Sequence, residues 1–261
     1  MIVRYEADGT IVMITQSDHA LASGLFAAHW GNAKFEKPRP YNSLVRAAMF
    51  HDRGWIRYET SPILDAEGKT PNYRQVPNSP EQLQAFEWAG DWLGEIDPYA
   101  GLMIAKHRTG LWQGRYGVIT KPPAIQRGEL PPHIKAFIAR NEDKQKPTAS
   151  KFDANELAIN YNLLQVWDMI SLYICQNEIL TPDTIDPVPT DYSGKHAAMT
   201  LTPLGHNTVA LDPYPFDQPS LTTNIVHRRL KKNKFKDQAE LQDVYFCTAP
   251  QTMAFKFVAK H

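Results

Sequence analysis

Apolar and polar residues alternate at the start of the chain, on both sides of the dipeptide Asp8-Gly9. Ile2 lies in the segment before this dipeptide and Ile11 in the segment after it. An Asp-Gly pair between two alternating segments is a strong short-range signal for a two-residue turn. The pattern therefore predicts a β-hairpin over residues 1–15.

The period changes at Ser17, and apolar residues then recur at the three- and four-residue spacings of an α-helix. Ser17 and Asn42 are expected to cap the first two helices, and Ser79-Pro80, Asp97-Pro98 and Asp153 to open later ones. Glu156 lies three residues after Asp153, as in a capping box. The predicted helices cover residues 17–30, 43–52, 80–93, 98–110, 133–143 and 153–176. Residues 57–78 and 114–128 are expected to form loops, residues 143–151 a polar linker, and the Pro- and Asp-rich residues 181–191 a connector.

The last part of the chain reads differently, because it favours strands. Residues 208–211, 222–230 and 253–258 are predicted strands, with one helix over residues 238–248. A lone hairpin is only marginally stable, so we expect the N-terminal hairpin to pair with these strands. The predicted fold is mainly α, with a small antiparallel β-sheet (α+β overall). It forms a single domain over residues 1–261, with a helical core at 17–178 and an accessory β-rich layer at 1–15 and 196–261.

Composition narrows the possible functions only slightly. The chain has 261 residues with equal numbers, 28 each, of basic and acidic side chains, so no strongly basic surface for nucleic acid is expected. No stretch resembles a signal peptide or is apolar enough to span a bilayer. Cys175 and Cys247 are far apart and lack metal-ligand spacing. We expect a reduced, cytoplasmic protein, although a single disulfide is compatible with the sequence.

Asp168 is the most conspicuous polar residue, because its predicted helix is apolar nearly all round. Trp167 and Met169 are its neighbours, and Leu164 and Leu172 share its stripe. Burying an unpaired carboxylate costs several kcal/mol, on the order of the usual penalty for a buried ion, unless a cation or donors compensate. A metal ion, an arginine or a hydrogen-bond network could each do so.

Several histidines are predicted on inward faces of other helices. His51 and Asp52 end the second helix, where the opening backbone lets both side chains reach one point. His19 shares a stripe with Phe26, and His107 follows Met103 by four residues. A lone inward histidine or aspartate usually serves core hydrogen bonding, capping or ion pairing. Four inward sites on four helices are better explained by one shared divalent ion.

The ordered set His19, His51-Asp52, His107 and Asp168 resembles the H…HD…H…D signature of the HD superfamily of metal-dependent phosphohydrolases. The segments at residues 15–20, 50–55 and 212–216 also resemble a bacterial family of unknown function that carries this helical core. The resemblance implies an HD-like helical bundle. It also implies that His19, His51, Asp52 and Asp168 bind the first metal, and that His107 binds a second ion or contacts substrate.

Two ligand questions stay open in the sequence. Arg108 follows His107 where the binuclear members have a second histidine, so one ion is expected and the presence of a second is undecided. His29 is a rival to His19, although it is turned about 80° from the His19 stripe. Imidazole and carboxylate ligands suit Mn, Fe, Ni, Co or Zn.

The expected function is hydrolysis of a phosphate ester or nucleotide-like anion by an activated water. Asp52 and His107 are the candidate catalytic residues, with Asp52 orienting the water. The candidate substrate-binding residues are Arg53, Lys106, Arg108 and Arg115. The alternatives are a di-iron oxygenase on an HD-type scaffold and a non-catalytic protein that binds a ligand or partner. The basic run at residues 228–236 is expected to be a solvated strand end.

Overall fold

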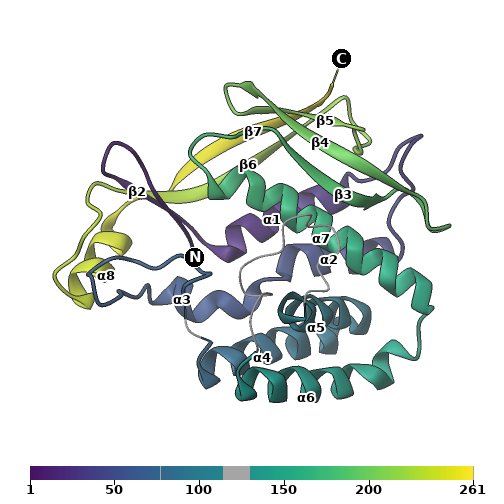
Figure 1. Ribbon diagram of the computed structural model, residues 1–261, viewed down its shortest axis with the longest axis horizontal. Coiled ribbons are helices and arrows are strands. Elements are labelled where there is room, and N and C mark those ends of the chain that lie inside the picture. Colours follow the sequence, from purple (N-terminus) through teal and green to yellow (C-terminus); the bar gives the residue numbers. More distant parts are fainter. Residues whose placement is uncertain (77, 114–129, 261) are drawn as a thin grey trace.

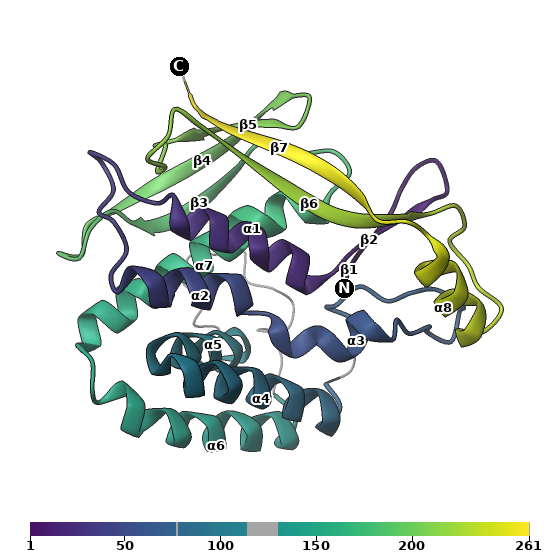
Figure 2. The same ribbon diagram turned by 180° about the vertical axis from the view of Figure 1, so that it is seen from behind.

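The computed structural model describes residues 1–76, 78–113 and 130–260, and it has two sides, a sheet and a stack of helices (Figure 1). Helices α1 and α7 lie against the sheet, α2 and α5 lie beneath them, and α4 and α6 lie farthest away (Figure 2). The principal helices are α1 (Gln16–Ala28), α2 (Tyr41–Phe50), α4 (Pro80–Ile96), α5 (Pro98–Trp112), α6 (Pro132–Ala149) and α7 (Ala154–Gln176).

Helix starts follow the predicted capping signals in three cases. The side chains of Ser79, Asp97 and Asp153 each accept a hydrogen bond from the backbone N–H three residues later. The prediction was wrong for the first two helices. Thr15 caps α1 by accepting a hydrogen bond from the Asp18 N–H, whereas the Ser17 hydroxyl donates to Glu59, and α2 begins at Tyr41 without a side-chain cap.

Helical structure also occurs at two places where the sequence predicted no helix. A 3-10 turn, η1 (Arg53–Trp55), and helix α3 (Ile56–Thr60) continue from the end of α2. Helix α6 also runs on to Ala149 through the residues expected to form a polar linker, with Pro147 inside its last turn. Within the described residues, no helix has the length and apolar composition needed to cross a membrane.

The sheet overturns the predicted fold class. Within the residues that the structure describes, it has seven strands with both parallel and antiparallel pairs, and these residues are 47% helix and 21% strand. It is therefore a substantial α+β fold, rather than a mainly α bundle with a small antiparallel sheet. The strands are β1 (Ile2–Tyr5), β2 (Ile11–Ile14), β3 (Asp183–Pro189), β4 (His196–Gly205), β5 (Thr208–Asp212), β6 (Ser220–Leu230) and β7 (Gln251–Ala259).

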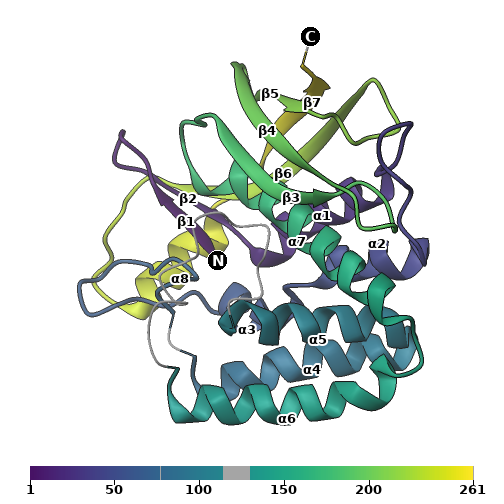
Figure 3. The same ribbon diagram turned by 45° about the vertical axis from the view of Figure 1, so that its right-hand side comes forward.

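The spatial order of the strands is β1-β2-β6-β7-β5-β4-β3 (Figure 3). The N-terminal hairpin pairs with a late strand, as expected, through β2 and β6. The parallel pair is β5 with β7, and helix α8 (Gln238–Cys247) connects β6 to β7. Strands β3 and β4 account for the error, because residues 181–191 were interpreted as a connector and residues 196–205 were not predicted to form a strand.

A proline inside β3 explains why the sequence pattern did not predict this strand. Pro187 lies in β3, where the register shifts between Ile185 and Val188, and β3 is an edge of the sheet. An edge strand or a bulge tolerates proline because no partner needs its N–H. Strands β4 and β5 are joined by His206 and Asn207, which both have positive φ, as a tight hairpin turn requires.

Aromatic residues fill the space between the sheet and α1. Phe26 on α1 packs edge-on against Phe257 of β7, with ring centroids 5.1 Å apart, and it stacks on Phe216. Trp167 on α7 lies against Trp30 just after α1. This aromatic packing fixes the positions of α1 and α7 against the sheet. The polar side chains on the opposite faces of these helices point toward α2 and α5.

Candidate metal centre

Four neighbouring helices bring five ionisable side chains together. Helices α2 and α7 contact each other and both α1 and α5, so residues distant in sequence meet between them. The five side chains are His19 of α1, His51 and Asp52 at the end of α2, His107 of α5 and Asp168 of α7. None of the five residues is more than 7% exposed. We call them the His/Asp cluster.

The ligand-type atoms of the His/Asp cluster lie at short and similar distances. Asp168 Oδ1 is 3.3 Å from His51 Nε2 and 3.8 Å from His19 Nδ1. Asp52 Oδ2 is 3.1 Å from His19 Nε2 and 3.8 Å from His51 Nε2. His107 Nε2 is more distant, at 4.0 Å from Asp168 Oδ2. The centre of the cluster is therefore His51, which faces both carboxylates.

Hydrogen bonds at the far side of the rings indicate which nitrogen faces the cluster. His51 Nδ1 lies 2.8 Å from the Ala48 carbonyl oxygen, to which it donates, so the lone pair of a neutral His51 is on Nε2. The Ser171 hydroxyl donates to the Asp168 carbonyl and therefore accepts from His19 Nδ1 at 2.9 Å. A neutral His19 then also presents a lone pair, on Nε2, to the cluster.

These distances fit a set of donors arranged around one cation. Two ligands about 2.1 Å from a metal and 90–109° apart are separated by about 3.0–3.4 Å. The His19–Asp52 and His51–Asp168 distances, 3.1 and 3.3 Å, fall in that range. In the described part of the chain, the ligand atoms form two overlapping groups, each within 4.8 Å, namely His19, His51 and Asp168, and His51, Asp52 and His107. The buried His/Asp cluster could therefore hold a metal ion.

The pKa directions show that the His/Asp cluster needs positive charge. Burial opposes ionisation of Asp52 and Asp168, but the neighbouring imidazoles, His51 first, hold the pKa of both carboxyls below the usual range. Burial would lower the pKa of His51, yet the two carboxylates outweigh it and raise that pKa to about 9. Burial and the nearby His51 lower the pKa of His107 to about 4. Either a proton on His51 or a metal ion can supply the charge.

Two supporting residues were missed in the sequence. Gln16 Nε2 donates to Asp52 Oδ2 at 2.9 Å, and Gln16 is buried in the first turn of α1. Ser171 lies one turn after Asp168 and receives hydrogen bonds from His19 and Ser23. Spacing could have indicated Ser171, because a residue three positions away shares the helix face of Asp168. Nothing in the sequence around Gln16 separates it from an ordinary helix start.

The structure separates the other candidate residues. His29 ends α1 and lies 3.0 Å from Asp217 on the surface, away from the His/Asp cluster, so His19 is the histidine that α1 contributes. Arg53 begins η1 and does not line the cavity beside the cluster, and Lys106 lies over the Tyr161 ring. Arg108 does line that cavity. Arg115 lies outside the described residues.

A cavity of about 110 Å³ adjoins the His/Asp cluster and reaches Asp52, His107 and Asp168. Tyr73 and Arg74 of the loop before α4 border it as well, a contribution that the sequence did not indicate because this loop has no periodic pattern. Its remaining lining is Gln16, Trp55, Val76, Asn78, Arg108, Leu111, Trp112 and Leu172. The cluster therefore has access to a space in which a small ligand fits.

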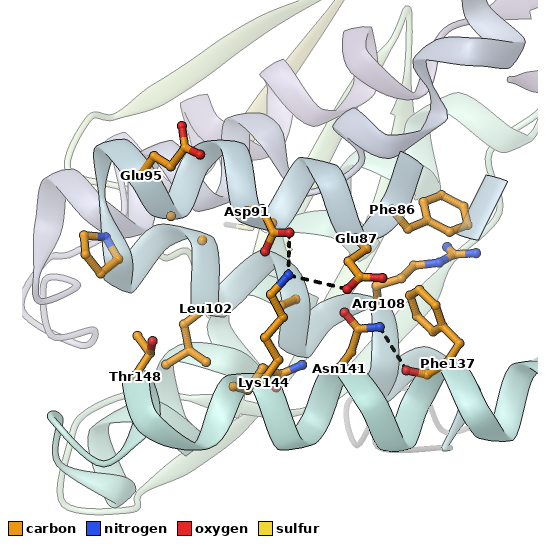
Figure 4. A pocket seen from close by; sticks show the side chains of 16 residues that line it. Phe86, Glu87, Asp91, Glu95, Leu102, Arg108, Phe137, Asn141, Lys144 and Thr148 are labelled. Atoms are coloured by element: carbon orange, nitrogen blue, oxygen red, sulfur yellow. Dashed lines mark hydrogen bonds and ion pairs between the residues drawn. The ribbon is translucent and has the colours of Figure 1, made fainter. Parts of the chain in front are cut away.

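A larger groove, of about 420 Å³, lies between α4, α5 and α6 (Figure 4). Lys144 reaches from α6 to Asp91 and Glu87 on α4, so these three side chains form ion pairs with one another, and Arg108 also lines the groove. None of its lining residues belongs to either group of ligand atoms. We therefore assign the candidate function to the smaller cavity.

The fold and the His/Asp cluster define an α+β protein with a buried centre that could hold a metal ion. The chain belongs to the family described as "Protein of unknown function (DUF3891)", whose profile matches residues 1–232. No curated protein and no solved structure matches the chain.

Proposed function

We propose that the protein is a metal-dependent hydrolase of phosphate esters, related to the HD superfamily through its ordered His/Asp set. The observation that carries the proposal is the convergence of imidazole and carboxylate donors from four helices beside a cavity. Buried ionisable groups with shifted pKa values in a cavity are typical of functional sites. Mn, Fe, Ni, Co and Zn all suit this donor set.

The arrangement favours one ion. His51 belongs to both groups of ligand atoms, but its Nδ1 donates to Ala48 and only Nε2 is turned to the cluster. One nitrogen lone pair binds one ion, so both groups describe the surroundings of the same cation. His19, His51, Asp52 and Asp168 would hold it, and His107 lies farther away, where it faces the cavity.

When bound, a divalent ion lowers the pKa of a coordinated water and polarises a phosphoryl oxygen. Asp52 borders the cavity, and its lowered pKa makes it a hydrogen-bond acceptor that orients the attacking water. Gln16 holds Asp52 in place by donating a hydrogen bond to its Oδ2. His107 is neutral near pH 7, because its pKa is about 4, and it can hydrogen-bond a substrate oxygen without adding charge.

Elemental analysis of the purified protein, joined to assays with phosphomonoester and phosphodiester panels, tests this function. We expect about one transition-metal ion per chain and metal-dependent hydrolysis. His51→Ala and Asp168→Ala should lose most of the metal and the hydrolysis, while circular dichroism shows a folded helical protein.

His29→Ala is the matched control, because His29 also pairs with an aspartate but lies outside the cluster. It should keep both metal and activity. A wild-type protein without metal, or an Asp168→Ala variant with unchanged metal content, would contradict the ligand assignment. Bound metal with no hydrolysis on either panel would contradict the hydrolase.

An iron-dependent oxygenase is the alternative function, and the same metal analysis distinguishes it from the hydrolase. Two irons would each need their own set of ligands, whereas here the two groups share the single Nε2 of His51. Iron at two equivalents per chain, with oxygen uptake, would favour the oxygenase over the hydrolase.

A further inference from the structure

Arg108 is held in a cage of aromatic rings at the edge of the cavity. Its guanidinium carbon lies 3.5 Å from the centroid of Phe86, 4.4 Å from Trp112 and 5.3 Å from Trp55. Figure 4 shows Arg108 beside Phe86 where α5 meets α4. A planar guanidinium stacks well on such faces, which fix its orientation.

No carboxylate forms an ion pair with Arg108 within the described part of the chain, and Asp52 acts on it only from a greater distance. Its hydrogen-bond partner is the neutral Asn78 oxygen, at 3.5 Å, and its buried Nε makes no hydrogen bond there. Arg39, Arg46 and Arg140, by contrast, each pair with a carboxylate. Burial lowers the pKa of Arg108 to about 10, so it remains charged at neutral pH. A caged and charged guanidinium points to an anionic ligand.

Arg74 brings a second guanidinium to the same cavity. It donates to the Tyr73 hydroxyl at 3.0 Å and to the Gln176 side-chain oxygen at 3.2 Å, both neutral acceptors. The described residues provide it with no carboxylate partner. Tyr73 is itself fixed by Gln176, which donates to its hydroxyl at 2.9 Å. Arg74 is exposed to solvent, and these neutral groups orient it at the cavity without forming an ion pair.

We propose that Arg108 and Arg74 together bind the phosphoryl oxygens of a phosphate monoester. This inference rests on the proposed function, because it places the anion beside an occupied metal centre. Two guanidinium groups and a divalent ion, set against the carboxylates of Asp52 and Asp168, leave two positive charges at the cavity. A monoester dianion cancels both, whereas a diester carries one negative charge and leaves one uncancelled.

The cavity also constrains the rest of the ligand. Its volume of about 110 Å³ is enough for a phosphoryl group, and the cavity is partly open, so the ester group can extend along the wall toward solvent. Trp55, Trp112 and Leu172 form its apolar wall. A small apolar or aromatic ester group fits that wall, and a polar group would lose hydration there without gaining a partner.

Calorimetric titration with phenylphosphonate, a non-hydrolysable monoester analogue, tests the inference separately from catalysis. Wild-type protein loaded with its own metal should bind the dianion at least about 10-fold more tightly than its monomethyl ester, since an ionic hydrogen bond is lost. Arg108→Met and Arg74→Met should each weaken binding by about 10-fold to 100-fold while the metal content stays unchanged.

Arg108→Lys keeps the charge but loses the two-pronged donor, so it should recover only part of the affinity. The matched control is Arg140→Met, because Arg140 also lies over an aromatic ring but pairs with Glu87 outside the cavity. It should bind like the wild type, and circular dichroism verifies that each variant is folded.

Equal binding by wild type, Arg108→Met and Arg74→Met would assign the arginines a packing role and overturn the inference, with the hydrolase proposal still standing. Failure of the loaded wild-type protein to bind phenylphosphonate would also overturn it. Arginine-dependent binding without hydrolysis of any phosphate ester would support the anion site and contradict the hydrolase.

Discussion

The residues of the His/Asp cluster are recognisable because each breaks a local rule. Asp168 is a carboxylate in an apolar helix, and the structure buries it at 4% exposure. Burying a charge is costly unless a cation accompanies it, so such a residue signals a partner before its position is known. His51 and Asp52 reach the same point because α2 ends at Phe50. The sequence indicated these donors and could not show the distances between them.

Gln16 tests how far the supporting residues control the metal. Gln16→Ala removes the hydrogen bond to Asp52 Oδ2 and leaves Asp52 with fewer constraints. We expect metal affinity to fall by about 10-fold to 100-fold, the usual effect of losing such a partner. Competition with a chelating dye measures the affinity.

Gln82→Ala provides the comparison for Gln16. Gln82 is equally buried, at 1% exposure, but donates to the Gly54 carbonyl outside the His/Asp cluster. Its loss should reduce stability and leave metal affinity unchanged. Equal affinities of both variants would show that Gln16 does not position Asp52.

At the scale of elements, helices were predicted better than their boundaries. The helix starts at Ser79, Asp97 and Asp153 were predictable because an N-cap side chain bonds to the backbone only three residues later. Ser17 was wrongly predicted as the cap of α1, because its hydroxyl donates to Glu59, which lies 42 positions away in the sequence. Pro187 argues against a strand in the sequence. Its position is acceptable only because β3 is an edge strand, which depends on how distant strands pair. Local signals were predictable, and those that depend on distant partners were not.

Packing of α4 on α5 relies on a close approach of two glycines. A Cβ on Gly101 would lie 2.5 Å from the backbone of Gly94, whereas a Cβ on Gly94 would meet nothing within 4 Å. Gly101→Ala should therefore destabilise the protein by about 1–3 kcal/mol, the usual cost of overpacking. Gly94→Ala should be neutral or stabilising by up to about 1 kcal/mol, from helix propensity.

Urea denaturation of both glycine variants measures these changes. Because α5 carries His107 and Arg108, Gly101→Ala should also weaken metal binding slightly through displacement of the helix. Equal stability of the two variants would mean that α4 and α5 are not in close contact at Gly101.

At the scale of the whole molecule, the sheet contributes to the core and supports the helices that carry the site. It was underestimated because β3 and β4 lack the signals of strands, and because a parallel pair between β5 and β7 cannot be deduced from alternation. The sheet matters for the site because α1 and α7, which carry His19 and Asp168, rest on it. The helical half alone would have an uncovered apolar face.

Phe257 tests this dependence. It is fully buried between the sheet and α1, against Phe26. Phe257→Ala should lower the free energy of unfolding by about 3–5 kcal/mol, as for other buried aromatic side chains. Phe246→Ala serves as the control, because Phe246 is 53% exposed. Its effect should stay within about 0.5 kcal/mol, and a comparable loss from both variants would contradict the packing described for Phe257.

The position of β7 has a consequence for how the protein is made. Strand β7 lies between β6 and β5, so β3, β4 and β5 join the remainder of the sheet only through residues 251–259. During translation, the helices and the first six strands leave the ribosome before the strand that unites them. Until then the nascent chain exposes two open strand edges, which are prone to aggregate. That interval is when a chaperone that shields such edges would act on this chain.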